Sequence, residues 1–546
     1  MQDVQLNEKT GDIKGEDVRT TTNIVAVDEL DFDGKHPAKH QLHAGIRQVD
    51  AAAALASKAV GHQLDPADAK RLLRKIDRNL LPLMMVPYAM QFIDKTTLGN
   101  SSILGIKTDT HLTTTQYNLL GSLFYIAYLA FEWPQNWALQ RFPVGKWMSL
   151  NITCWAIFLC CFAACSNFAG LAVLRVGLGM CEGSITAGFM IVTSSWYTLS
   201  EQAVRTGYWF LMNGTAQVVS GLLSYGVLQI GLENSFKPWR VFFLLTGGMT
   251  LVVALAYWIF FPDSPMTAKF LTEEEKIMAI ERIRENKTGV ENKTWKKEQF
   301  IEALLDWKLW TFAVFAAFNN VRPFESSAQG NIEITWSATS KVPNSLTNQN
   351  SLIIKSLGYE TWQTTLLGCV SGVVEIVTIW TSTLALKRWP NHRGYIGAAW
   401  LVPNVIGAIL IVTLPYSNQA GILICLYVTG VGTPGFVIAL AWINNCVTGH
   451  TKKTTTNAAF LIGYCLGNLL APLIYSICVV MMLGIRWRLN YENKQRDKVQ
   501  AESGGEEDEY GYIDEIQEDG TTITHKVDKS FMDLTDKQNL SFRYPL

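Results

Sequence analysis

Apolar runs of about 20 residues recur between residues 79 and 486, whereas both ends of the chain and a central segment carry most of its charge. About 20 apolar residues suffice for a helix to cross the hydrocarbon core of a bilayer. We therefore expect an all-α polytopic membrane protein. The predicted spans are residues 79–106, 117–139, 147–164, 168–194, 207–232 and 239–261, then 307–320, 362–386, 394–414 and 420–443, with a last apolar stretch at 457–485.

Basic residues concentrate in alternate loops. They precede the first span between Lys70 and Arg78, follow the second at Arg141 and Lys146, and recur at 387–393, 450–453 and 486–496. This alternation predicts that both termini lie in the cytosol, because loops rich in Lys and Arg stay on the cytosolic side. The expected parts are a cytosolic tail (1–78), a six-helix bundle (79–262), a cytosolic linker (263–306), a second bundle (307–489) and a second tail (490–546).

Local signals indicate where some helices begin. Asp65 and Pro66 have the residue types of an N-cap and a first helical position. Thr272 and Glu275 have the spacing of a capping box at the start of an amphipathic linker helix. The acidic segment 501–520 is expected to be mobile.

Composition narrows the function further. Of the 546 residues, 49% are hydrophobic and 17% are charged, and the net charge of −1 says little because the charges lie in loops. The ten cysteines fall in or beside apolar segments without metal spacing, and the eight histidines fall outside the predicted spans. No cofactor, metal site or nucleic-acid partner is expected, and no nucleophile and base suggest an enzyme.

Residues 171–190, LAVLRVGLGMCEGSITAGFM, are long enough to span a bilayer yet contain Arg175 and Glu182. Seven residues place both on one helix face, about 10 Å apart along the axis. A charge in hydrocarbon costs several kcal/mol, which marks such residues as functional or as a packing pair. A fixed cation beside a titratable carboxylate suits a protein that binds an anion and moves a proton.

Among the other charges within predicted spans, three are candidate functional residues. Asp94 and Lys95 are adjacent and lie roughly 22 Å along the first span. Adjacent side chains on a helix point about 100° apart, so one is expected to face a cavity and the other a neighbouring helix. Alternatively, both serve gating or helix packing. Glu375 is a third intramembrane acid.

Several motifs resemble those of a known family. RFPVGK after the second span and LRVGLGMCEG in the fourth resemble signatures of the major facilitator superfamily. FIDKTTLGNSSILGIKTD, YLAFEWPQNWALQRFPVGKW and FMDLTDKQNLSFRYPL resemble the fungal allantoate and nicotinate permease group of anion:cation symporters. The resemblance covers residues 65–320 and 342–546. It implies twelve helices in two six-helix bundles, with alternating access to a central site.

The resemblance also implies roles for the fourth span. Vesicular glutamate and sialate transporters, which are distant relatives, carry an Arg and a Glu at this spacing. Their implied roles, anion binding and proton coupling, carry over to Arg175 and Glu182. The superfamily's loop signature has an acid before its Arg, but here Gln140 replaces it, so gating is expected to differ. The fifth span lacks the antiporter-type motif, which favours symport.

The expected function is proton-coupled uptake of a small organic anion such as allantoate, ureidosuccinate or nicotinate, by a monomer in the plasma membrane. The alternatives are a vitamin permease of the pantothenate or biotin type, a small-peptide permease, and a nutrient receptor on the same fold. A channel is a further class, although no repeated filter sequence is visible.

The candidate site residues follow from these expectations. Arg175 would hold the substrate carboxylate, because a guanidinium makes two parallel hydrogen bonds with it. The remaining assignments are Asn213, Gln217, Asn319 and Asn320 for uncharged substrate parts or interhelix bonds; Glu182, Asp94 and Glu375 for proton coupling; and Lys95, Arg141 and Lys146 for gating.

Two segments do not fit the expected pattern. Residues 321–341 place charges and a proline inside the seventh span. A retained intron that keeps the reading frame would explain them, and the alternative is a genuine loop inserted within a broken helix. Near the end, residues 458–485 contain no charge but are too few for two spans and a turn, which need roughly 40 residues. We expect one long helix kinked near Pro472, which leaves the following basic segment outside or forces the stretch to re-enter on the same side.

Overall fold

The computed structural model describes residues 43–45, 65–230, 237–284, 286, 295–320, 346–415, 417–470, 476–502, 510–516, 522–528, 534–539 and 542–546. Residues 321–341, for which an intron is predicted, lie outside these described residues. The described residues all belong to the compact unit His43–Leu546.

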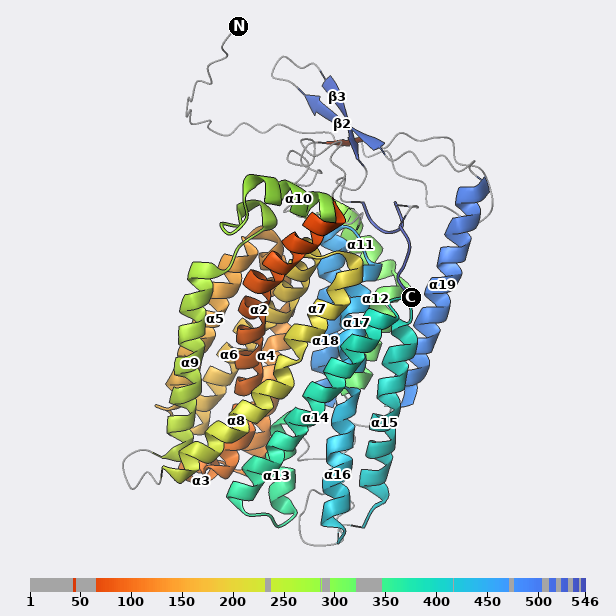
Figure 1. Cartoon of the computed structure of the whole chain (residues 1–546). Coiled ribbons are helices and arrows are strands. Elements are labelled where there is room, and N and C mark those ends of the chain that lie inside the picture. Colours follow the sequence, from red (N-terminus) through yellow and green to blue (C-terminus); the bar gives the residue numbers. More distant parts are fainter. Residues whose placement is uncertain are drawn as a thin grey trace, which may run out of the picture. The chain divides into compact units, whose positions relative to one another are not determined.

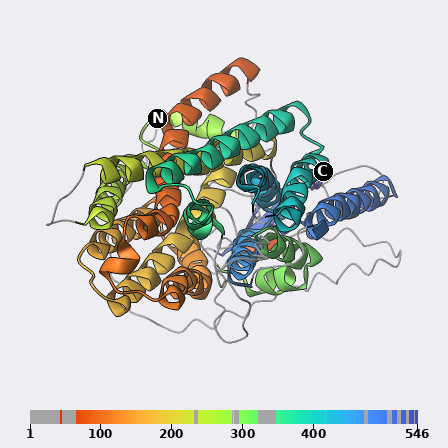
Figure 2. The same cartoon turned by 90° about the horizontal axis from the view of Figure 1, so that it is seen from below.

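The first half of the chain forms one group of helices, coloured red to yellow-green in Figures 1 and 2. The break between α7 and α8 is a single residue, Leu211, which itself keeps helical dihedral angles. These helices are α2 (Pro66–Ile103), the short α3 (Ile106–Asp109), α4 (Thr114–Arg141), α5 (Val144–Phe162), α6 (Phe168–Trp196), α7 (Leu199–Phe210), α8 (Met212–Gln229) and α9 (Pro238–Phe260).

The second half forms the neighbouring green-to-blue group. The short 3-10 turn η3 joins α16 to α17, and together the three form one helical segment that is long enough to cross a membrane. The helices are α12 (Trp307–Asn320), α13 (Leu346–Ser356), α14 (Thr361–Arg388), α15 (Arg393–Thr413), α16 (Gln419–Thr429), η3 (Gly430–Gly432), α17 (Thr433–Cys446), α18 (His450–Leu470) and α19 (Ser476–Glu502).

Within the described residues, six helical paths are long and apolar enough to cross a membrane. Each of the six agrees with a predicted span to within about three residues at either end, which supports the expected polytopic membrane fold. They are Val144–Phe162, Phe168–Trp196, Pro238–Phe260, Thr361–Arg388, Arg393–Ile411 and Gln419–Cys446.

The predicted caps are confirmed. Asp65 accepts a hydrogen bond from the Ala67 backbone N–H at 3.0 Å, and Pro66 opens α2. Thr272 and Glu275 exchange bonds of 2.9 and 3.3 Å at the start of the linker helix α10 (Glu273–Arg284). Lys75 of α2 also binds Glu275.

A second linker helix, α11 (Lys297–Leu305), lies with α10 at the end of the molecule where α2 begins (Figure 1). The short 3-10 turn η2 (Pro265–Thr267) precedes α10. We call this end the cytosolic end, following the charge pattern of the loops, and the opposite end, where α3 and α13 lie, the outer end.

Glycines allow the helix α6 to pack closely against its neighbours. A Cβ on Gly179 would collide with the carbonyl oxygen of Phe124 in α4. A Cβ on Gly177 would lie 2.9 Å from the Phe158 ring of α5. The fourth span therefore sits in the middle of the first half, where its charges are removed from lipid.

The last two helices bear on the long helix predicted over 457–485. Helix α18 is described as far as Leu470 and α19 from Ser476, so the predicted kink near Pro472 lies outside the described residues. Arg486 of α19 binds the carbonyl of Asn391 in the loop between α14 and α15, so α19 runs back to the cytosolic end. The arrangement matches the alternative in which the stretch re-enters on the same side.

The C-terminal region is more ordered than the sequence suggests. Strand β2 (Tyr510–Ile516) pairs antiparallel with β3 (Thr522–Asp528) and parallel with β1 (His43–Gly45). Residues Tyr510–Ile516, within the segment expected to be mobile, thus form a strand. Alternating Tyr, Ile and charged residues give this segment the period of a strand, which its acidic composition obscures.

Residues 534–539 and 542–546, which we call the C-terminal clamp, bind the cytosolic ends of several helices. Asp536 accepts bonds from Lys308 of α12 at 2.8 Å and from Lys452 of α18 at 2.7 Å. Asp306 pairs with the same two lysines at 3.1 and 2.9 Å. Burial alone would raise the pKa of Asp536 and Asp306, but the two lysines outweigh it and lower both pKa values.

Further bonds hold the clamp in place. Arg496 of α19 donates to the backbone carbonyls of Asp536 and Phe542 at 2.7 and 3.1 Å. Trp442 of α17 donates to the carbonyl of Pro545 at 2.6 Å. The clamp thus joins α12, α17, α18 and α19 at one end of the second half.

Candidate functional site

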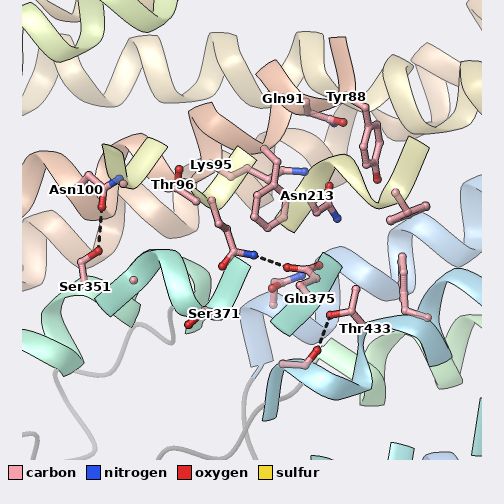
Figure 3. A pocket seen from close by; sticks show the side chains of 18 of the residues that line it. Tyr88, Gln91, Lys95, Thr96, Asn100, Asn213, Ser351, Ser371, Glu375 and Thr433 are labelled. Carbon is pink, nitrogen blue, oxygen red and sulfur yellow. Dashed lines mark hydrogen bonds between the residues drawn. The ribbon is translucent and has the colours of Figure 1, made fainter. Parts of the chain in front are cut away.

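A polar cavity of about 160 Å³ lies where the two halves meet. Hydroxyl, amide and aromatic side chains from both halves form its wall (Figure 3). From the first half they include Tyr88, Gln91, Lys95, Asn100, Tyr128, Thr186, Asn213 and Gln217. From the second half they include Asn319, Ser351, Thr364, Thr365, Ser371, Glu375, Thr433, Phe436, Tyr464 and Asn468.

Lys95 provides the cation of this cavity. Its ammonium pairs with the buried Glu182 carboxylate of α6 at 2.7 Å and lies 5.9 Å from the ring centre of Tyr464 in α18. Its side chain is 13% exposed, whereas that of Glu182 is 2% exposed. The ion pair therefore has one partner at the cavity wall and the other behind it.

Glu375 provides the carboxylate on the opposite wall. Gln217 of α8 donates a hydrogen bond to it, and this bond joins the two halves across the cavity (Figure 3). Asn213 lies one turn before Gln217 and also lines the cavity, as expected for two residues four apart on one helix face. The cavity thus has opposite charges from different halves.

A small void of about 10 Å³ lies inside the first half, behind the cavity. Asp94, Arg175 and Trp155 line it together with Lys95 and Glu182. Both oxygens of Asp94 and two nitrogens of Arg175 are buried there without a hydrogen-bond partner among the described residues. A void of this size holds about one water, which would satisfy such groups.

The candidate charged residues within the spans line the central cavity, the small void or, for Lys95, both. Lys95 faces the cavity and Asp94 faces the interior of the first half, as predicted for adjacent residues. Arg175 and Glu182 share one void, in agreement with their seven-residue spacing. Arg175, however, does not line the central cavity, and its guanidinium lies 5.3 Å from the ring centre of Phe162.

The remaining candidates are placed as follows. Asn319 is buried and lines the cavity, while the side chain of Asn320 lies outside the described residues. Arg141 is exposed at the cytosolic end of α4, and Lys146 is exposed in the first turn of α5. The Lys146 backbone N–H donates to Asp263 after α9, which ties the RFPVGK loop to the end of the sixth span.

The halves contact each other at both ends of the cavity. At the outer end, Ser351 of α13 donates to Asn100 of α2 at 3.0 Å (Figure 3). At the cytosolic end, Gln140 donates to Thr451 of α18 at 3.0 Å. Arg393 of α15 donates to the carbonyl of Leu199 in α7, also at 3.0 Å. Gln140, which replaces the expected acid, therefore contacts the other half directly.

Sequence reasoning missed several cavity residues. Ser351 belongs to α13, which was not predicted because the interrupted seventh span hides its apolar pattern. Tyr464 lies in a stretch interpreted only by its hydropathy. Alternation of small and polar residues through TTLLGCVSGVVE would have indicated a polar helix face at Thr364, Thr365 and Ser371.

Two groups of membrane helices that enclose a polar, charged cavity at their contact define a small-molecule transporter. The chain belongs to the Major Facilitator Superfamily, whose family model matches residues 84–472. The family prediction made from the motifs is confirmed, and this family consists of transporters rather than enzymes.

Similar transporters occur in two yeasts. The chain is 32% identical over 508 residues to an uncharacterized transporter of Schizosaccharomyces pombe, covering 88% of this chain and 85% of the relative. It is 31% identical to the thiamine pathway transporter of Saccharomyces cerevisiae, covering 88% and 87%. It is 29% identical to the allantoate permease of the same yeast, covering 91% and 90%.

Among solved structures, the chain is similar to the proton:xylose symporter of the same superfamily bound to 6-bromo-6-deoxy-D-glucose. The TM-score is 0.51 and the sequence identity is 12%, with 73% of this chain and 87% of the symporter covered. This likeness supports the fold alone.

Proposed function

We propose that the protein is a proton-coupled symporter that takes up a small organic anion across the plasma membrane and works as a monomer. The observation that carries the proposal is the Lys95–Glu182 ion pair at the cavity wall, 2.7 Å between Nζ and Oε1. A substrate carboxylate and Glu182 would compete for the same ammonium. Protonation of Glu182 removes this competition, and the free Lys95 then binds the substrate.

This scheme couples the two ligands thermodynamically. A buried ammonium without a partner is costly, so a neutral Glu182 makes anion binding more favourable. Conversely, a bound anion leaves Glu182 without its cation and favours the protonated acid. By linkage each ligand strengthens the binding of the other by the same factor.

The scheme also assigns roles to the other residues. Asn213, Gln217 and Asn319 would bind uncharged parts of the substrate, since all three line the cavity. Glu375 would be a second acid that responds to the loaded cavity through its bond to Gln217.

The interior charges support the ion pair rather than touch the substrate. Asp94 and Arg175 would keep the side chains of Lys95 and Glu182 in position, because all four residues line the same small void. Arg175 adds a positive charge beside Asp94 and Glu182, whereas Lys95 makes the direct contact with the substrate carboxylate. Arg141 and Lys146, which are exposed on either side of the short connection between α4 and α5, would act only in gating.

The substrate class is supported by the cation in the cavity and by the similarity to an allantoate permease. A vitamin or vitamin precursor is the second candidate, because the thiamine pathway transporter is slightly more similar. A panel of uptake measurements at two pH values distinguishes these two substrate classes. It contains radiolabelled allantoate, ureidosuccinate, nicotinate, pantothenate and biotin, each with and without a protonophore.

The ion pair is tested by neutral substitutions. Lys95→Gln is expected to weaken binding of the transported anion about 10- to 150-fold, because a hydrogen bond to a charged group contributes about 1.5–3 kcal/mol. Lys107→Gln is the matched control, because Lys107 lies near the outer end and outside the cavity wall. Equal affinities in both variants would disprove the role of Lys95.

Glu182→Gln tests the coupling. It leaves Lys95 free at every pH, so substrate binding is expected to lose its pH dependence while accumulation against a gradient disappears. Retained accumulation with a wild-type pH profile would show that Glu182 does not carry the coupling proton.

A further inference from the structure

Glu132 of α4 is a buried carboxylate that the scheme above does not use. Its exposed fraction is 0%. It lies one helical turn beyond Tyr128, which lines the cavity, and about 13 Å from the cytosolic end of α4 at Arg141. It is therefore placed between the cavity and the cytosolic end.

The hydrogen bonds of Glu132 show that its carboxyl group lacks one hydrogen-bond donor. Asn136 donates from Nδ2 to Oε1 of Glu132 at 2.7 Å and to its backbone carbonyl at 2.9 Å. The other carboxyl oxygen, Oε2, and the amide oxygen Oδ1 of Asn136 are both buried without a partner among the described residues. Both atoms are acceptors when Glu132 is ionised. A proton on Oε2 supplies the donor that this acid–amide pair lacks.

The surroundings of Glu132 do not replace that proton with a cation. Its Oε2 lies against Gly183 of α6, where an added Cβ would approach it to 3.3 Å. No Lys, Arg or His in the described part of the chain makes an ion pair with it. The titratable or charged groups around it are Tyr128 of α4, Glu182 of α6 with its partner Lys95 of α2, and Tyr464 and Cys465 of α18.

An isolated carboxylate is costly to ionise in such a place. The charges of Lys95 and Glu182 offset each other, and Tyr128, Tyr464 and Cys465 carry no charge at neutral pH. The closed contact of α4 with α18 thus favours the neutral acid. Separation of these two helices, which belong to different halves, would admit water and make ionisation easy.

We propose that Glu132 is the residue from which a transported proton leaves toward the cytosol. Glu132 holds the proton while α4 and α18 are closed. When they separate, the acid O–H bond breaks, the proton passes to cytosolic water and a carboxylate remains. That carboxylate is reprotonated through the cavity after the opposite end opens. The inference rests on the proposed proton coupling and adds its exit step.

The test uses Glu132→Gln in the full chain, because glutamine resembles the neutral acid in shape. The probe is the panel member that the wild type takes up fastest, with allantoate tested first. We expect the variant to reach the membrane and to exchange bound for free substrate at a rate within a few-fold of the wild type. Concentrative uptake should fall at least tenfold, and its pH profile should become flat.

Asn136→Ala is the matched control. It removes the hydrogen-bond partner and keeps the titratable group, so it should still concentrate the probe, with a displaced pH profile. A purely structural role of Glu132 would instead give similar defects in exchange and accumulation in both variants.

Three outcomes overturn the inference. In the first, Glu132→Gln concentrates the probe with the wild-type pH profile. In the second, Glu132→Gln and Asn136→Ala lose exchange and accumulation to a similar extent, which would show that Glu132 has only a structural role. In the third, the wild type accumulates no panel member or is insensitive to a protonophore, and the proposed function then fails together with the inference. Only the third outcome affects the proposed function.

Discussion

The C-terminal clamp should stabilise the second half of the protein through Asp536, and Asp536→Asn measures this contribution. The side chains of Asp536 and Lys452 are 0% exposed and that of Lys308 is 2% exposed. Removing one partner of a buried ion pair typically costs 3–5 kcal/mol. We expect about 3 kcal/mol, the lower end, because Asp306 still faces both lysines.

Asp497→Asn is the control for this measurement. Asp497 also forms a 2.8 Å ion pair, with Arg543, but its side chain is 64% exposed. An exposed pair contributes about 0–1 kcal/mol. The two variants therefore remove the same charge at one end of the molecule and differ mainly in burial.

The assay is thermal unfolding of the purified protein in detergent, followed by loss of the monodisperse species. For a cooperative unit of about 200 residues, 1 kcal/mol shifts the midpoint by roughly 2–4 °C. Asp536→Asn should lower it by about 6–12 °C and Asp497→Asn by no more than about 4 °C. Equal shifts in the two variants would refute the account of the clamp.

The pH dependence gives a second check. The pKa of Asp536 is lowered in the folded state, so its stabilisation is present above the unfolded pKa of about 3.9 and is lost only as pH falls below that value. The difference between wild type and Asp536→Asn should therefore stay constant from about pH 5 to pH 8. A difference that vanished within this range would contradict the buried ion cluster.

Two further predictions concern helix contacts. Gly179→Ala should reduce the amount of folded protein at the cell surface severalfold, because its Cβ would collide with the Phe124 carbonyl, whereas Gly226→Ala should be neutral because no atom lies within 4 Å of its Cβ; surface labelling compares the two. Thr451→Val removes the hydroxyl that Gln140 binds, so it should favour opening at the cytosolic end by about 1 kcal/mol. Cysteine-accessibility rates at that end would show this change, and unaltered rates would argue against a gating contact.

Local signals predicted the parts of the fold that depend on nearby residues. The N-cap at Asp65 and the capping box at Thr272 were predictable because each needs only a few neighbours in sequence. Helix length and hydropathy located most spans for the same reason. The pairing of Lys95 with Glu182 was not predictable, because helix spacing suggested Arg175 as the partner of Glu182 and only the packing of α2 against α6 decides between the two cations.

Polar contacts between residues far apart in the chain could not be predicted from the sequence. Lys308 and Asp536 are 228 residues apart. Lys308 lies at the start of a predicted span and Asp536 lies in the polar C-terminal tail, and nothing in either segment indicates that the two side chains are buried together. Likewise, Gln217 and Glu375 were each recognised as polar residues within spans, but nothing local indicated that they meet across the cavity.

The clamp has a consequence for how the protein is made. Lys308 and Lys452 are synthesised and inserted well before Asp536 leaves the ribosome, so the nascent chain must hold two lysines without one of their buried counter-ions. Until translation passes residue 536, the bases of α12 and α18 remain hydrated and the second half cannot complete its packing. Assembly of the transporter is thereby tied to the end of translation, and prematurely terminated chains retain a charged, open surface that cellular quality control can distinguish from the finished protein.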